Sequence, residues 1–157
     1  YNKMQFGFLG FYNKGIGQSP FERFYVGGDG LSGYALDGRE IIALRGYENS
    51  ALTPTDNIGN DVGGTIYDKF VTELRYPVSL NPSATIYVLG FFEGGNAWST
   101  FREFAPFSLK RSSGVGLRVF LPMFGLLGLD YGWRLDPQRD DTRTGVGKFS
   151  FVIGQQF

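Results

Sequence analysis

The segment SGVGLRVFLPMFGLLGLDYGWRLD, from Ser113 to Asp136, decides the fold of this 157-residue chain. Large apolar residues alternate along it with small or charged ones, so that Leu117 falls on the face opposite Arg118 and Tyr131 opposite Arg134. Period-two alternation is typical of a strand with one apolar face, because successive side chains of a strand point to opposite sides. The segment therefore predicts two antiparallel strands joined by a tight connection at FGLLG, residues 124–128.

The same alternation occurs in three further segments, and a fourth segment, 85–98, is apolar on both faces. The predicted apolar faces carry Met4, Phe6, Phe8 and Tyr12; Ile66, Phe70, Leu74, Tyr76 and Val78; Val115, Leu117, Val119, Leu121 and Met123; Leu129, Tyr131, Trp133 and Leu135; and Phe149, Phe151, Ile153 and Phe157. We count six strands of roughly eight to fourteen residues. No segment has the 3.6-residue stripe of an amphipathic helix.

Long and tight connections alternate between these strands. The long ones are the irregular stretch 15–62 and the polar loops 99–113 and 136–145, whereas 79–84 and 124–128 are short. An up-and-down meander with its two ends in different compartments has this arrangement.

The polar faces of the strands carry Lys, Glu, Arg and Asp with Gly and Gln, which suits a wet lumen, and the opposite faces suit lipid. Tyr76, Trp98, Trp133 and Phe157 stand near strand ends, as in the aromatic girdles of membrane barrels. A soluble β-sandwich or lipocalin-like barrel also alternates, with the faces reversed. We predict an all-β fold, an antiparallel transmembrane β-barrel. Six strands cannot close such a barrel, which needs about eight, and the chain starts within a strand pattern, so we expect the other strands outside it.

The composition disfavours several classes of function. The chain has no His and no Cys, and its 15 Lys and Arg balance 15 Asp and Glu. Without His, the usual general base and transition-metal ligand are missing, which disfavours an enzyme such as a protease or phospholipase. Zero net charge disfavours nucleic-acid binding. The glycine-rich GGDGLSG lacks a phosphate-loop Lys, and the acidic loops lack calcium-ligand spacing, so we expect no cofactor and no metal.

Four segments in order carry a family resemblance: PFERFYVGG at 20–28, LRGYE at 44–48, FFEGGNAW at 91–98, and the segment from Ser113 leading to a last strand that ends at Phe157. Together they resemble the C-terminal barrel part of the BamA family of outer-membrane β-barrel assembly factors and its wider superfamily of assembly and secretion pores. The resemblance implies a partial barrel domain over residues 1–157, the last six strands of a sixteen-stranded barrel, with a long extracellular loop at about 15–62. It also implies upstream strands and periplasmic domains beyond this chain.

The chain departs from the family pattern at three places. Tyr47 stands where the family usually has Phe, and Glu93 stands where it has Asp. An insertion at 29–43 separates the Gly-Gly pair from the Arg-Gly pair, so the path of the inserted loop stays open. Both single substitutions keep the chemistry of the side chain.

The resemblance places the long loop inside the barrel lumen. A guanidinium there is costly unless it is paired, and a lumen-facing carboxylate can pair it through charge-assisted hydrogen bonds. We expect a loop lock made of Arg45, Gly46, Tyr47, Glu93 and Gly95: an Arg45–Glu93 pair, a turn at Gly46, packing of Tyr47, and room for the loop at Gly95.

The final strand, about 148–157, resembles a β-signal and implies a lateral gate, a weakly paired seam with the first strand of the barrel. We assign to this gate strand Phe149, Phe151, Ile153, Gly154 and Phe157, with Gly154 helping the strand to bend away. An exposed strand edge can pair with an incoming chain.

The resemblance implies a non-enzymatic component of the outer-membrane protein assembly machinery in the bacterial outer membrane. Its partners would be membrane lipids and lipopolysaccharide, unfolded outer-membrane protein clients, accessory assembly lipoproteins and the remaining barrel strands, with no nucleic acid. The alternative within the superfamily is a two-partner-type secretion pore or a surface-export barrel. A passive porin is disfavoured by a plugging loop.

Overall fold

The computed structural model describes the chain except for residues 12–14, 16–18, 20, 31–38, 124 and 155–157. The described residues form eight strands: β1 (Asn2–Phe8), β2 (Phe24–Val26), β3 (Glu40–Ile42), β4 (Ile66–Asn81), β5 (Ala84–Trp98), β6 (Lys110–Leu121), β7 (Gly125–Arg134) and β8 (Gly147–Gly154). Six of them form one antiparallel sheet in the order β1-β4-β5-β6-β7-β8. The predicted all-β, antiparallel fold class is confirmed. In the described part of the chain, no helix is both long and apolar enough to cross a membrane.

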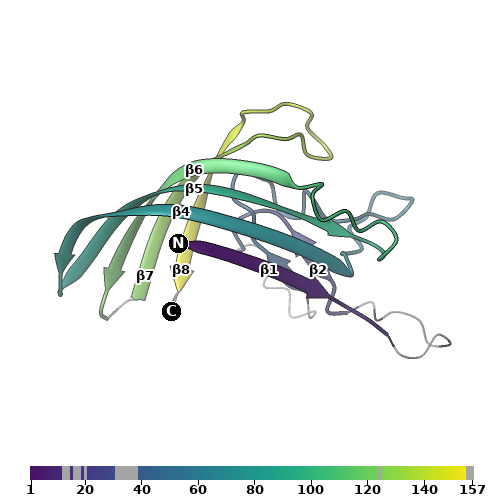
Figure 1. The fold of residues 1–157 in the computed structure, drawn as a ribbon, viewed down its shortest axis with the longest axis horizontal. Coiled ribbons are helices and arrows are strands. Elements are labelled where there is room, and N and C mark those ends of the chain that lie inside the picture. The colour runs from purple at the N-terminus through teal and green to yellow at the C-terminus, as the bar shows by residue number, and fades with distance from the viewer. Residues whose placement is uncertain (12–14, 16–18, 20, 31–38, 124, 155–157) are drawn as a thin grey trace.

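The sheet is strongly curved, and the long β1–β4 connection, with β2 and β3, folds back against its concave face (Figure 1). A hydrophobic cluster joins the two layers. Val26, Leu44 and Tyr47 of the connection are fully buried in it, against Tyr67 of β4 and Ala97 of β5. Burial of this cluster holds the connection on the sheet, because apolar area removed from water stabilises by roughly 25 cal/mol per Å².

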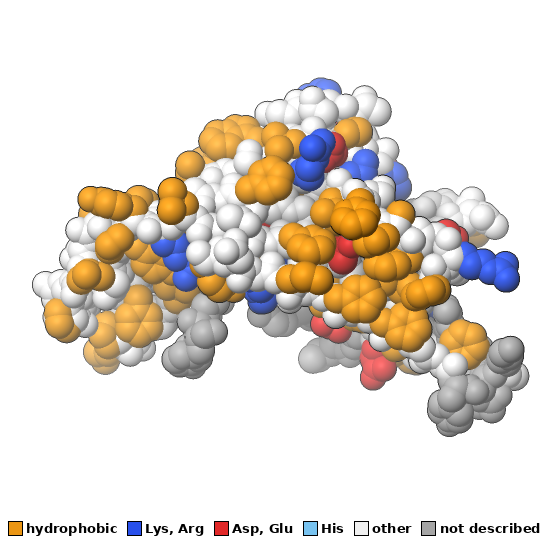
Figure 2. Space-filling model, in the orientation of Figure 1, with side chains coloured by type: hydrophobic (Ala, Val, Ile, Leu, Met, Phe, Trp, Pro, Cys, Tyr) orange, Lys and Arg blue, Asp and Glu red, His pale blue; other side chains and the backbone are white. Residues whose placement is uncertain are grey.

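The two faces of the sheet have the character that the alternation predicted. On the convex face Leu117 is 41% exposed and Phe151 is 58% exposed, whereas on the concave face Arg118 and Arg134 are only 3% and 2% exposed. Figure 2 shows hydrophobic side chains gathered over much of the visible surface of the sheet. An apolar exterior with buried charges inside is the reverse of a soluble β fold.

Several strand boundaries differ from the prediction. β1 ends at Phe8, short of the predicted Tyr12, which lies outside the described residues, as does Phe157. β4 and β5 have 16 and 15 residues, longer than predicted. Residues 125–128, predicted as part of a tight connection, already belong to β7. For β4, β5 and β7 the cause is the same: Gly and Pro in these segments suggest turns, but pairing with a long neighbouring strand continues the strand.

The long connection is also more regular than the sequence indicated. β2 and β3 pair in parallel, with Phe24 opposite Glu40 and Val26 opposite Ile42. These two strands are only three residues each, too short to produce a visible alternation.

Trp98 does not lie in an open lipid-facing girdle as predicted. It is only 8% exposed, since the β5–β6 loop folds over the convex face and stacks Phe104 edge-on against it, with ring centroids 5.0 Å apart. Phe104 also reaches Phe6 of β1. Beneath this loop, Asp68 of β4 lies on the convex face and is 3% exposed.

Candidate functional site

The backbone after β3 brings Arg45 to the centre of the concave face. Leu44 donates its N–H to the Gly28 carbonyl at 3.0 Å and is fully buried. The chain then turns at Gly46, whose φ is +86°. A hydrophobic anchor before Arg45 and a left-handed turn after it thus fix the direction of the arginine side chain.

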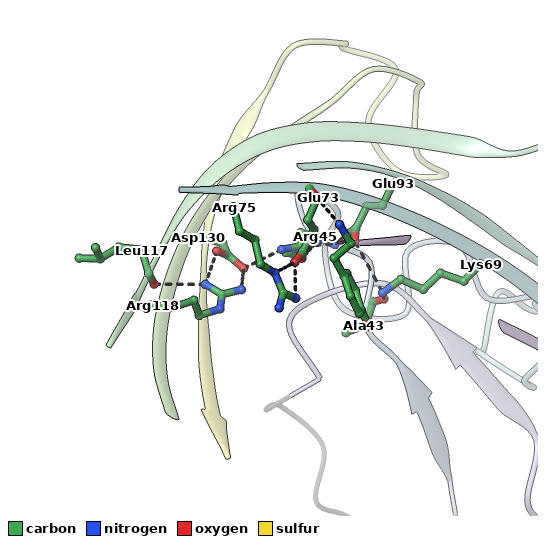
Figure 3. A network of polar contacts seen from close by, with 10 residues as sticks. Ala43, Arg45, Lys69, Glu73, Arg75, Glu93, Leu117, Arg118 and Asp130 are labelled. Atoms are coloured by element: carbon green, nitrogen blue, oxygen red, sulfur yellow. Dashed lines mark hydrogen bonds and ion pairs between the residues drawn. The ribbon is translucent and has the colours of Figure 1, made fainter. Parts of the chain in front are cut away.

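Arg45 contacts three carboxylates that come from three different strands (Figure 3). Its Nη2 donates to Glu93 of β5 and to Glu73 of β4, both at 3.0 Å, and its Nη1 donates to Asp130 of β7 at 3.1 Å. Its Nε lies 3.2 Å from the same Glu93 oxygen, and its backbone N–H donates to the other one. Glu93 is therefore the partner with the most contacts, and it is 1% exposed.

Each of the three carboxylates also has a cation on the sheet itself. Glu73 pairs with Arg75 at 2.7 Å, Asp130 with Arg118 at 2.5 Å, and Glu93 lies 3.7 Å from Lys69. Lys69 additionally donates to the backbone carbonyl of Ala43, which belongs to the connection. Arg45 is thus the fourth cation in a network with three carboxylates, and the only one of the four carried by the connection.

The Arg45 guanidinium also lies over the ring of Phe91, with its central carbon 3.6 Å from the ring centroid. Burial alone would lower the pKa of Arg45, but the charge of Glu93, its hydrogen bond and the charges of Asp130 and Glu73 raise it above its ordinary value. The arginine therefore stays charged at every accessible pH, and the contact does not act as a proton switch.

Gly46 and Gly132 meet where the connection touches β7. A Cβ on Gly132 would lie 2.9 Å from the backbone nitrogen of Gly46, and a Cβ on Gly46 would lie 3.2 Å from the Arg134 backbone nitrogen. Two backbones can approach this closely only where neither residue has a side chain. At Gly95, a Cβ would lie 2.8 Å from the Asp68 carbonyl and 3.5 Å from Leu44.

Tyr47 is completely buried, and its hydroxyl donates to the carbonyl of Arg111 at 2.8 Å. A second contact, at 3.3 Å, leads to the carbonyl of Asp136 just after β7. Burial raises the pKa of the Tyr47 phenol, which therefore stays neutral and available as a donor. This hydroxyl binds the connection to β6 and to the segment that follows β7, a contact that Phe at the same position could not make.

The final strand β8 pairs with β7 from Gly147 to Gly154 and, in the described part of the chain, with no other strand. Phe149, Phe151 and Ile153 point to the convex face and are 58–66% exposed. Gly154 ends the strand with φ at +151°, and its position has open space for a Cβ.

The connection also reaches β8 and the β7–β8 loop. Glu48 forms an ion pair with Lys148 of β8, and its N–H donates to Gln138 at 3.4 Å. Arg139 of the same loop pairs with Asp61 at 2.9 Å. The segment that carries Arg45 is therefore attached to the edge strand through side chains.

Sequence reasoning did not assign Glu73, Asp130, Phe91 or Gly132 to this site. Glu73 and Asp130 do stand on the predicted polar faces of their strands, so the alternation was a usable signal for their direction. The alternation could not predict which residues of neighbouring strands lie at the same level of the sheet, because this depends on strand register. The described residues contain no cluster of His, Cys, Asp and Glu that could hold a metal ion.

Comparison with protein-family models matches residues 2–157 to the Omp85 superfamily domain. No curated protein matches the chain. The match covers the whole of the sheet and the connection, including every residue of the site around Arg45.

Proposed function

The chain belongs to the Omp85 superfamily, and on that premise we propose that it forms the C-terminal barrel wall of a BamA-type factor, which folds and inserts β-barrel proteins into the bacterial outer membrane. Omp85 superfamily proteins are β-barrels of the outer membrane, or of organellar outer membranes, that serve assembly or secretion and are not enzymes. The assembly role, the bacterial location and the sixteen-stranded barrel are the further steps of this proposal.

The observation that carries the proposal is the strand pairing of β8 and its exposed apolar face. It pairs with β7 from Gly147 to Gly154 and has an apolar face exposed on the convex side at Phe149, Phe151 and Ile153. In the assembly role this strand forms a weakly paired seam with the first strand of the barrel, and backbone groups left unpaired there in lipid cost several kcal/mol each until an incoming strand pairs with them. An unfolded client that adds a strand there would gain both strand pairing and apolar burial.

Within this proposal the residues Arg45, Gly46, Tyr47, Glu93 and Gly95 act as the loop lock. The lock holds the connection against the inner face of the wall, where it obstructs the lumen and braces β7 through Gly132. The Glu48–Lys148 ion pair extends the same brace to the gate strand. Accessory lipoproteins, lipopolysaccharide and the missing strands of the barrel are the partners that the assembly role requires.

The test is site-specific photocrosslinking in the full-length protein, expressed in the bacterium from which it comes. A photoreactive residue at Ile153 of β8 is expected to capture pulse-labelled outer-membrane proteins, with adducts that disappear during the chase. The matched control is Leu74 of β4, which is equally lipid-facing at 82% exposed but lies within the sheet, and it should capture none.

Depletion of the protein distinguishes the two roles known in the superfamily. An assembly factor is required by many barrels, so its depletion should lower the level of unrelated outer-membrane proteins together. Loss of a single secreted passenger, with normal levels of other barrels, would instead assign the chain to the two-partner-type secretion pores or surface-export barrels.

A further inference from the structure

The convex face of the sheet carries a groove of about 520 Å³ between β5, β6, β7 and β8. Its lining is apolar apart from the Tyr131 hydroxyl and contains no charged residue: Val88, Leu89, Gly90, Val115, Gly116, Leu117, Leu129, Tyr131 and Phe149. The groove therefore differs from the charged network around Arg45, which lies on the concave face of the same sheet.

Gly90 leaves a gap at the β5 side of this groove. It points to the convex face between Val88 and Phe92, and a Cβ built on it would have only the Gly114 carbonyl nearby, at 4.0 Å. The neighbouring lipid-facing side chains project from the sheet around the gap, with Val115 54% exposed and Leu117 41% exposed. A side chain is thus missing at a position where its neighbours leave room for one.

The level of the groove within the membrane decides what can fill it. Gly90 stands six residues after Ala84, the first residue of β5 beyond the tight turn. At about 3.3 Å per residue and a tilt of about 40°, this is roughly 15 Å along the barrel axis, near the middle of an apolar band about 25 Å tall. Lipid headgroups and water do not reach this level, whereas acyl chains do.

We propose that this groove seats one acyl chain of a membrane lipid, held by packing against Gly90, Val115 and Leu117. A chain in a concave surface contacts protein on several sides and gains dispersion contacts that it lacks against a flat wall. The proposal rests on the outer-membrane location of the superfamily and not on the assembly role, so the two can fail separately.

The experiment uses the full-length protein in liposomes that contain a phospholipid with a photoreactive group in the middle of one acyl chain. Labelled residues are mapped by mass spectrometry of peptides. We expect the adducts to concentrate at Val115 and Leu117, with fewer on the lipid-facing residues of β4.

The decisive variant is Gly90→Leu, which fills the gap at the β5 side of the groove. It should lower labelling at Leu117 by about threefold, the effect of one weak side-chain interaction inside a membrane. Thr72→Leu places the same leucine side chain on the convex face of β4, outside the groove, and should leave labelling unchanged. Gly90→Ala, a smaller substitution for which this half-buried position has room, should give an intermediate decrease if the larger variant fails to fold.

Equal labelling over the whole convex face, or labelling at Leu117 that is unchanged in Gly90→Leu, would overturn the proposal. A second arm places a photoreactive residue at Leu117 in native membranes. Lipid adducts alone support the acyl-chain seat, whereas a protein adduct would mean that another polypeptide occupies the groove and that the proposal is wrong.

Discussion

Removal of the Arg45 side chain is expected to release the connection from the sheet, and the three carboxylates should not contribute equally. In Arg45→Met, Glu73 keeps Arg75 at 2.7 Å and Asp130 keeps Arg118 at 2.5 Å. Glu93 keeps Lys69 at 3.7 Å and the backbone N–H of residue 45, but it loses two guanidinium hydrogen bonds and is the least exposed carboxylate after Asp130. The loss should therefore fall mainly on Glu93.

The magnitude follows from this difference. Breaking a buried ion pair from one side costs about 3–5 kcal/mol when the remaining charge has no partner. Because Lys69 still neutralises part of the Glu93 charge, we expect Arg45→Met to lower the free energy of local opening by about 3 kcal/mol, the lower end of this range. In double-mutant cycles, the coupling of Arg45 with Glu93, tested with Glu93→Gln, should be roughly 2–3 kcal/mol. The coupling with Asp130, tested with Asp130→Asn, should be about 1 kcal/mol or less, since Arg118 already neutralises it.

The assay is hydrogen exchange of the backbone amides of Leu44 to Glu48 in the full-length protein in lipid. Exchange from the folded state reports the free energy of local opening and does not require reversible unfolding of the whole barrel. Arg102→Met, which removes an exposed arginine of the β5–β6 loop, is the control and should leave these amides unchanged. Equal coupling energies of Arg45 with Glu93 and with Asp130 would refute the view that cations on the sheet neutralise part of the carboxylate charge.

Three further results are expected. Gly46→Ala should destabilise the loop by about 2–4 kcal/mol, because it adds a close contact with β7 to the strain of a positive φ. The control Gly59→Ala, at φ +96° in open space, should cost about 1 kcal/mol. The rate of proteolysis of the loop measures both effects. Tyr47→Phe should keep the packing and lose two contacts with backbone carbonyls, which raises proteolysis of the loop by a factor corresponding to about 1–2 kcal/mol. Hydrogen bonds from Arg143 hold the pKa of Asp141 below its ordinary value of 3.8, so this stabilisation is present above that pH and is lost as the pH falls through the lower folded-state pKa. Protection of the β7–β8 loop amides, corrected for the intrinsic pH dependence of exchange, should fall with acid, and Asp141→Asn should remove the dependence.

The sequence by itself determined the strands and the orientation of their faces. Alternation is a local property, since each side chain's direction follows from its position in the strand. It placed Leu117 and Phe151 on the convex face and Arg118 and Arg134 on the concave face, and the structure agrees at all four positions. The residues of the loop lock were identified differently, through a resemblance carried by the order of four motifs.

Only the tertiary structure decided which charges meet. Glu73, Glu93 and Asp130 are separated from Arg45 by 28, 48 and 85 residues, and they come together because strand register sets their height and sheet curvature turns them inward. The contact of Gly46 with Gly132 has the same origin. Register and curvature arise from the pairing of whole strands, so no short segment of the chain contains them.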